Sequence, residues 1–154
     1  MTITTCLWFQ GDVEAAITRY TSLFPDSEVL SLESMSMEPP VQLAEWRMLG
    51  TTFRAISQQA PFRFTEAISL SVPCADQEET DRYWYGLLEG GCEESQCGWL
   101  KDPWGLSWQI VPDRLGQLLG DPDPARATAA REVMFTQRRI VIADLEAAAD
   151  RAGS

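Results

Sequence analysis

The chain has no histidine among its 154 residues, so any chemistry must depend on carboxylates, arginines, tyrosines, thiols or Lys101. Histidine is the commonest general base and the commonest metal ligand. Its absence excludes the usual nucleophile–histidine arrangements and most zinc and non-haem iron sites. The cysteines Cys6, Cys74, Cys92 and Cys97 have no zinc-ligand spacing and do not make a disulfide scaffold in a chain of this length. We therefore expect reduced thiols and no resident metal.

Three charged side chains are candidates for a functional site. Arg54 could hold an anionic ligand through a bidentate contact, or it could form a salt bridge with Glu66 or another carboxylate. Glu66 could act as a general base if burial raised its pKa. Lys101 is the only lysine of the chain and has tryptophans on both sides in the sequence. It could be an amine nucleophile or a cation stacked on an indole, but a lysine just before an Asp-Pro turn is more typical of a solvated charge.

The chain is strongly acidic, with 23 Asp and Glu against 12 Lys and Arg and a formal net charge of −11. Its longest basic cluster is the pair Arg138-Arg139, so it lacks the cations that a nucleic-acid partner requires. The first residues contain no basic region followed by an apolar stretch, and no apolar run approaches the ~18 residues of a spanning helix. We therefore expect a cytoplasmic protein with no nucleic-acid partner and no membrane association.

The sequence predicts two successive units with the same order of elements. In the first unit, alternating apolar residues predict a strand over Thr2–Phe9, and helical spacing after Gly11-Asp12 predicts a helix that ends at Phe24. A hairpin over 28–37 and 41–49 follows, and then a strand over Thr51–Ser57. In the second unit we expect, in order, a strand over Ala67–Pro73, a helix over 76–89, short strands over 92–96 and 97–101, a turn at 102–105 and a strand over 106–111.

The repeat suggests an alignment of the two units. The pair Arg19-Tyr20 matches Arg82-Tyr83 at an offset of 63 residues (82 − 19 = 63). The glycines that open the last strands, Gly50 and Gly105, differ by 55 (105 − 50 = 55), so the first unit is eight residues longer between its helix and its last strand. We expect the extra residues in the hairpin at Pro39-Pro40.

Beyond Pro112 the sequence becomes helical. It predicts a short helix from Asp113, a helix over Ala125–Arg138 after the start signal Asp123-Pro124, and a last helix over 144–150. We thus divide the chain into paired modules at 1–112, the first at 1–60 and the second at 66–112, and a helical extension at 113–154. The extension must pack on the body or on a partner subunit.

Strand alternation separates the side chains that face the helix of each unit from those on the opposite side, where a βαβββ sheet curves into a cup. On the last strand of the second unit, Leu106, Trp108 and Ile110 face the helix, and Ser107 and Gln109 face the cup. On the two first strands, the residues that face the cup are Thr4, Cys6, Trp8, Ala67, Ser69 and Ser71. Small and polar residues suit a ligand cavity, although helices or a partner subunit could fill the same space.

The chain resembles the PhnB-like branch of the vicinal oxygen chelate superfamily over almost its whole length. The segments that carry the resemblance are CLWFQGDVEAA, LFPDS, PFRFTEAISLSV, DRYW, GGCEESQCGWLKDPWGLSWQIVP and DPDPARA. The resemblance implies an α+β fold of the glyoxalase and bleomycin-resistance type, in which two βαβββ modules form a cupped mixed sheet. It also implies a homodimer, whose modules pair within a chain or swap between chains.

Two activities that the resemblance implies conflict with the residues present. Members of the superfamily usually hold a divalent metal in each cup. The matching positions are Thr4 and Arg54 in the first module and Ala67 and Gln109 in the second. These residues cannot form a transition-metal site. Many relatives carry a methyltransferase label, but the first strand is followed by Phe9–Asp12, which lacks the glycine-rich turn that a methyltransferase of the usual kind needs.

We therefore expect a metal-free protein without a cofactor that binds a small anionic or aromatic molecule. The residues expected to contact it are Thr4, Cys6, Trp8, Arg54, Glu66, Ala67, Ser69 and Gln109. Two alternatives remain. One is an isomerase, lyase or dioxygenase-like enzyme of the same superfamily with a non-standard metal site, and the other is a structural or interaction dimer with filled cups. The sequence names neither the ligand nor a reaction.

Overall fold

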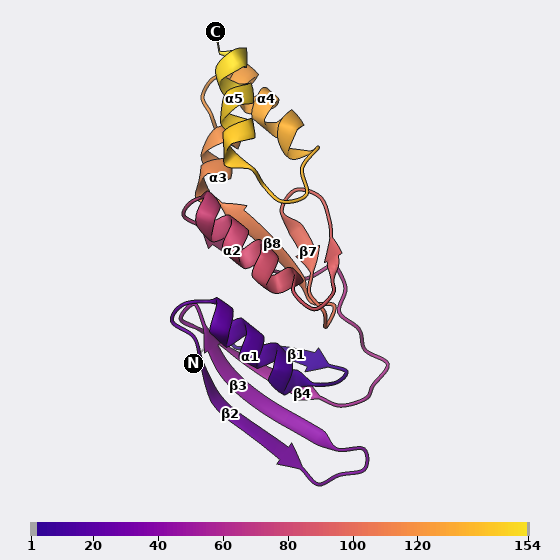
Figure 1. Cartoon of the computed structure of the whole chain (residues 1–154). Coiled ribbons are helices and arrows are strands. Elements are labelled where there is room, and N and C mark those ends of the chain that lie inside the picture. The colour runs from indigo at the N-terminus through magenta and orange to yellow at the C-terminus, as the bar shows by residue number, and fades with distance from the viewer. Residues whose placement is uncertain (1–2, 154) are drawn as a thin grey trace. The chain divides into compact units, whose positions relative to one another are not determined.

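The computed structural model describes residues 3–153 and divides into two compact units, with the boundary between Thr65 and Glu66 (Figure 1). Each unit holds one four-stranded mixed sheet with a helix packed on one face. The predicted strand start at Thr2 lies outside the described residues. The α+β class and the paired βαβββ order that the sequence predicted are confirmed.

The first unit contains β1 (Thr5–Phe9), α1 (Val13–Leu23), β2 (Glu28–Met35), β3 (Val41–Met48) and β4 (Thr51–Ser57). The strands lie in the order β1-β4-β3-β2, and β1 runs parallel to β4. The helix begins after Asp12, whose carboxylate accepts a hydrogen bond from the backbone N–H of Ala15 at 3.0 Å. Tyr20 of α1 packs against Trp46 of β3 with ring centroids 6.5 Å apart, and both side chains are fully buried. The core of this unit therefore lies between α1 and one face of the sheet.

The second unit repeats this arrangement with β5 (Ser69–Cys74), α2 (Gln77–Leu88), β6 (Glu93–Glu94), β7 (Trp99–Lys101) and β8 (Ser107–Pro112). Its strand order, β5-β8-β7-β6, and the parallel pairing of β5 with β8 match those of the first unit. β6 and β7 are shorter than predicted. Cys97 and Gly98 have positive φ angles of 58° and 84°, and their N–H groups donate to the carbonyls of Gln137 and Arg138 instead of extending a hairpin.

The alignment of the two units at an offset of 63 is wrong, although the repeat itself is confirmed. Phe9 pairs with Ser57 and Cys74 pairs with Pro112, so the first strands correspond at an offset of 65 (74 − 9 = 65) and the last strands at 55 (112 − 57 = 55). The helix caps, Asp12 and Asp76, differ by 64 (76 − 12 = 64). The matching Arg-Tyr pairs misled the alignment because they stand at different distances from their helix caps.

The corrected offset moves one predicted site position. Ala67 does not lie on the first strand of the second unit, since β5 begins at Ser69 and Ala67 stands in an exposed turn before it. With the offset of 65, Ser69 is the counterpart of Thr4. Thr4 itself is half-buried and immediately precedes β1.

The predicted turn at 102–105 is organised by a buried carboxylate. Asp102 is 3% exposed and accepts hydrogen bonds from the N–H groups of Trp104 and Leu106, both at 3.0 Å. Its other oxygen accepts a hydrogen bond from Nε1 of Trp108 at 2.9 Å. Trp108 is fully buried on the side of α2, which confirms its predicted place in the core.

The C-terminal part of the second unit contains α3 (Asp113–Leu119), α4 (Pro124–Met134) and α5 (Ile142–Ala152). The start signal at Asp123-Pro124 is confirmed. α4 ends four residues earlier than predicted, since the carbonyls of Gln137 and Arg138 accept hydrogen bonds from Cys97 and Gly98. The three helices and the segment before α5 share a buried apolar cluster of Leu115, Leu118, Ala130, Ile140, Leu145 and Ala149. Within the described residues, every helix is too short or too polar to cross a membrane.

Candidate functional site

The face of the second sheet opposite α2 is predominantly polar. Lys101 of β7 lies opposite Ser107 of β8 and opposite Glu93 of β6, so the three side chains share a face. Trp99 and Gln109 form the next pair on that face. The neighbouring residues of β8 that face α2, Trp108 and Ile110, are fully buried together with Leu106, as strand alternation predicted.

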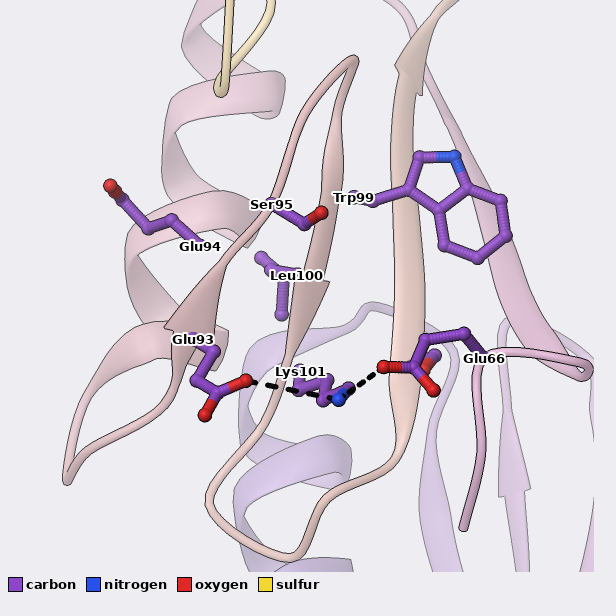
Figure 2. Close-up of a pocket in the computed structure, with 8 residues that line it drawn as sticks. Glu66, Glu93, Glu94, Ser95, Trp99, Leu100 and Lys101 are labelled. Carbon is purple, nitrogen blue, oxygen red and sulfur yellow. Dashed lines mark ion pairs between the residues drawn. The ribbon is translucent and has the colours of Figure 1, made fainter.

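A pocket of about 130 Å³ opens on this polar face (Figure 2). The residues that line it are Glu66, Glu93, Glu94, Ser95, Trp99, Leu100, Lys101 and Ser107. Figure 2 shows the Lys101 ammonium between the carboxylates of Glu66 and Glu93. It pairs closely with Oε1 of Glu66 and lies 3.8 Å from Oε2 of Glu93. The pocket therefore holds one cation between two carboxylates.

This ion pair corrects two expectations about the charged residues. The side chain of Lys101 is 33% exposed and contacts two carboxylates, so its charge is both partly solvated and paired. The hydrogen bond from Lys101 lowers the pKa of Glu66, so Glu66 does not have the raised pKa of a general base. The same contact raises the pKa of Lys101, which keeps the amine protonated and unsuited to nucleophilic attack.

Ser107 is a buried polar residue without a hydrogen-bond partner. Its side chain is 1% exposed and lines the pocket, and its Oγ atom has no partner among the described residues. Buried hydroxyls are usually hydrogen-bonded, because leaving one unpaired costs about 1–3 kcal/mol. The sequence placed Ser107 on the cup face but gave no sign that its hydroxyl would lack a partner.

Gln109 and Ser69 contact each other on the same polar face. Nε2 of Gln109 donates a hydrogen bond to Oγ of Ser69 at 2.8 Å. The two predicted site residues are thus brought together by the parallel pairing of β5 and β8. Ala67, which the sequence also predicted to contact the ligand, carries no polar side chain and precedes β5.

The first sheet has a groove on the face opposite α1, with a volume of about 360 Å³. Its polar centre is Arg54, whose Nε lies 2.8 Å from Oε2 of Glu45. Cys6 lies opposite Arg54 on the neighbouring strand and is exposed in the groove. Arg54 thus forms the salt bridge that the sequence allowed, with Glu45 as its partner and not Glu66.

Trp8, another predicted site residue, is anchored beside the linker between the units. Its indole N–H donates a hydrogen bond to the carbonyl of Gln58 at 2.9 Å. The ring of Phe62 meets the Trp8 ring edge-on at a centroid distance of 5.1 Å. Trp8 therefore shares its strand with Cys6 but does not belong to the lining of the Arg54 groove.

The residues at the two expected metal positions do not fit a divalent ion. In the first unit, Arg54 places a guanidinium where a ligand should be and engages Glu45. In the second unit, Gln109 supplies an amide and Ser69 a hydroxyl, which are neutral and weak ligands for transition metals. Among residues 3–153, no three carboxylate or thiol side chains gather closely enough to hold a metal ion.

Comparison with known proteins gave one family model and several solved structures. A model of the family described as 3-demethylubiquinone-9 3-methyltransferase matches residues 1–111. The PhnB protein from Bacillus cereus, which carries the same methyltransferase name, is 31% identical, with 73% of this chain and 99% of that chain covered and a TM-score of 0.63. A search among curated proteins found no match.

Two structures with lower identity share the fold. Protein PA1353 from Pseudomonas aeruginosa is 16% identical, with a TM-score of 0.50 and coverage of 73% of this chain and 100% of that chain. The fosfomycin resistance protein FosX from Listeria monocytogenes, in complex with Mn(II) and sulfate, is 11% identical. Its TM-score is 0.52, and 70% of this chain and 88% of that chain are covered.

Proposed function

The chain belongs to the family described as 3-demethylubiquinone-9 3-methyltransferase, the PhnB-like branch of the vicinal oxygen chelate superfamily, and from this premise we propose that it binds a small molecule without a metal ion. The polar pocket around Lys101 is the observation that carries this proposal. It lies on the sheet face away from α2 and contains charged, hydroxyl and aromatic groups. A few convergent polar groups in a concave site are typical of small-molecule binding.

Methyl transfer, which the family's name describes, does not suit the turn after the first strand. Close approach of a methyl-donor cofactor needs a glycine-rich turn and free N–H groups at the following helix. Here the turn contains Gly11 alone, and the carboxylate of Asp12 occupies the N–H of Ala15 at the start of α1. We therefore include no methyl transfer in the proposed function.

The metal-free part of the proposal is supported by the cations of the two sheets. Arg54 occupies the polar centre of the first groove and Lys101 that of the second pocket, and each is paired with a carboxylate on its own sheet or linker. A bound divalent ion next to either cation would meet like-charge repulsion. The proposal includes a homodimer, as the family resemblance suggests.

A thermal-shift screen in the presence of a chelator tests the proposed function. The panel contains small carboxylates, phosphorylated compounds and aromatic molecules, and each hit is measured again with Lys101→Met and Arg54→Gln. We expect at least one compound to raise the Tm of the chelator-treated wild type. That shift should disappear in Lys101→Met and persist in Arg54→Gln, which is altered only in the first unit.

Two outcomes of the screen would contradict the proposal. A divalent metal that co-purifies at one equivalent per chain and is needed for every Tm shift would favour a metal-dependent enzyme. A panel in which no compound shifts the Tm would favour a structural or interaction dimer with filled cups.

A further inference from the structure

We propose that Lys101 and Ser107 form a carboxylate-binding subsite that the side chain of Glu66 occupies in this structure, so that a small carboxylate binds by displacing Glu66. This inference rests on the proposed function, because it names the chemical class of ligand that the pocket takes. It is drawn from the ion pair, the unpaired hydroxyl and the size of the pocket.

Lys101 supplies the only cation among the residues that line the pocket. Its ammonium already binds a carboxylate, that of Glu66, in the arrangement that a ligand carboxylate would adopt. The contact favours the charged form of both groups, because it lowers the pKa of Glu66 and raises that of Lys101. The ion pair is therefore present throughout the neutral pH range, and a ligand must compete with it.

Glu66 is the partner that a ligand can displace. It stands in the turn before β5, and its side chain is 63% exposed. An exposed ion pair contributes only about 0–1 kcal/mol, so swinging the Glu66 side chain into solvent has a small free-energy cost. Lys101, in contrast, is fixed on β7 by its pairing with β6 and β8.

Ser107 supplies a second donor that Glu66 leaves unused. Because Ser107 lies directly opposite Lys101 in the antiparallel pair of β7 and β8, their Cβ atoms are about 4.5–5.5 Å apart. The Ser107 hydroxyl is buried and unpaired in this structure. A carboxylate that reaches deeper than Glu66 can accept a hydrogen bond from Ser107 with one oxygen and contact Lys101 with the other. Such a hydrogen bond would satisfy the buried hydroxyl.

Charge and size restrict the ligand to a small monoanion. A monoanion that replaces Glu66 restores the charge balance around Lys101, whereas a dianion would face the carboxylate of Glu93, 3.8 Å from the same ammonium. The nearby carboxylate of Glu94 is engaged by Nε1 of Trp84 at 3.2 Å and by Arg138 at 3.4 Å. The volume of about 130 Å³ admits a molecule of a few heavy atoms.

Acetate titrations of the full-length protein test the subsite. Binding of sodium acetate is followed by the NMR signals of the protein, with sodium chloride at equal ionic strength as the reference. We expect Glu66→Gln to bind acetate at least about 3-fold more tightly than the wild type, since the competing carboxylate is gone. Adding Ser107→Ala to Glu66→Gln should weaken binding about 10-fold, the effect of losing one hydrogen bond to a charged group. Lys101→Met should remove binding.

Glu93→Gln is the matched control, because it removes one negative charge from the same pocket without releasing the close partner of Lys101. We expect a smaller gain in acetate affinity than with Glu66→Gln. Equal gains in the two variants, or no gain with Glu66→Gln, would overturn the inference. If acetate does not bind while another compound still raises the Tm in a Lys101-dependent way, the assignment of the carboxylate subsite is wrong and the proposed function holds. Ser107→Ala alone should have a free energy of unfolding equal to or above that of the wild type. This measurement checks that the substitution leaves the protein folded.

Discussion

At the residue scale, Cys6 and Cys74 differ in thiol reactivity because they lie at differently exposed positions of their sheets. Cys6 is exposed in the groove of the first sheet, whereas Cys74, at the end of β5, is 1% exposed. Burial raises the pKa of Cys74 to about 11, because the thiolate would lose its hydration. The buried thiol is therefore protonated and unreactive at neutral pH, and it packs as a small apolar residue.

The raised pKa of Cys74 predicts a loss of stability at alkaline pH. Between its ordinary value of 9.0 and about 11, the unfolded chain releases the thiol proton while the folded chain keeps it. The free energy of unfolding should fall as the pH rises through this window, and the contribution is fully present below pH 9. Urea unfolding at pH 8, 9 and 10 measures the slope, which should be shallower in Cys74→Ala.

Thiol titration provides an independent check of this residue. In native protein at pH 8, we expect an aromatic disulfide reagent to modify Cys6 rapidly and to modify Cys74 only after urea is added. Cys6→Ser should remove the fast phase. Rapid modification of Cys74 in the native state, or an unchanged alkaline slope in Cys74→Ala, would show that the thiol is not held in its buried, protonated form.

The candidate site could be predicted from the sequence only where local geometry decides it. Strand alternation places Gln109, Ser69 and Cys6 correctly on the sheet faces opposite the helices, because side-chain direction depends on the backbone alone. The contact between Lys101 and Glu66 joins residues far apart in the sequence through the position of a linker turn, which no periodic pattern encodes. The unpaired hydroxyl of Ser107 is likewise a property of packing.

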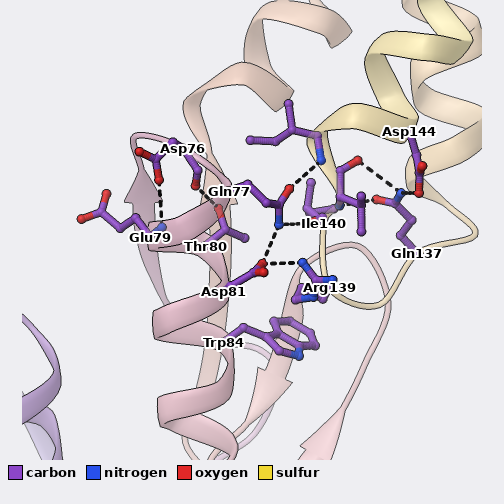
Figure 3. A network of polar contacts seen from close by, with 12 residues as sticks. Asp76, Gln77, Glu79, Thr80, Asp81, Trp84, Gln137, Arg139, Ile140 and Asp144 are labelled. Atoms are coloured by element: carbon purple, nitrogen blue, oxygen red, sulfur yellow. Dashed lines mark hydrogen bonds and ion pairs between the residues drawn. The ribbon is translucent and has the colours of Figure 1, made fainter.

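At the scale of elements, cap and proline signals predicted the helix starts well, but contacts distant in sequence set several other ends. The segment after α4 is held by α2 through Gln77 (Figure 3). Nε2 of Gln77 donates to the carbonyl of Ile140 at 3.0 Å, and its Oε1 accepts from the N–H of Ile142 at 2.8 Å. Arg139 pairs with Asp81 of the same helix. α5 therefore begins at Ile142, two residues before the predicted start.

At Gly98 the hairpin of the second unit contacts this C-terminal segment. We expect a substitution at Gly98 to destabilise the protein strongly. A Cβ atom there would lie 2.7 Å from the backbone oxygen of Ile110 and 3.3 Å from Cγ1 of Ile140, at a φ of +84°. We expect Gly98→Ala to lower the free energy of unfolding by about 3 kcal/mol, through strain and overpacking together. Urea unfolding followed by tryptophan fluorescence measures the change.

Two other glycines separate the causes of this loss. Gly105 has a φ of +87°, but a Cβ atom added there would have no neighbour within 4 Å, so Gly105→Ala should cost only about 1 kcal/mol, from backbone strain. Gly11 has neither feature, and Gly11→Ala should be close to neutral. A Gly98→Ala variant no less stable than Gly105→Ala would show that the close approach of Ile110 does not constrain the hairpin.

At the scale of the whole molecule, the first sheet ends in a strand with exposed apolar side chains. β2 is one of the two edge strands of this sheet, and only β3 pairs with it among the described residues. Val29, Leu30 and Met35 are 47%, 44% and 46% exposed. An exposed apolar edge strand is a template for association with another chain, and proteins usually cover or charge such an edge. This strand is therefore the surface at which the proposed homodimer is best tested.

Sedimentation at micromolar concentration should give a mass of twice the 17.2 kDa of the chain. The double substitution Val29→Lys and Met35→Lys should shift the protein toward monomer, because burying two ammonium groups in an apolar contact is unfavourable. Phe135→Lys is the control, since Phe135 is equally apolar and 61% exposed but lies at the end of α4. A dimer unaffected by the β2 substitutions but dissociated by Phe135→Lys would place the interface on the C-terminal helices, and a wild-type monomer would contradict the homodimer itself.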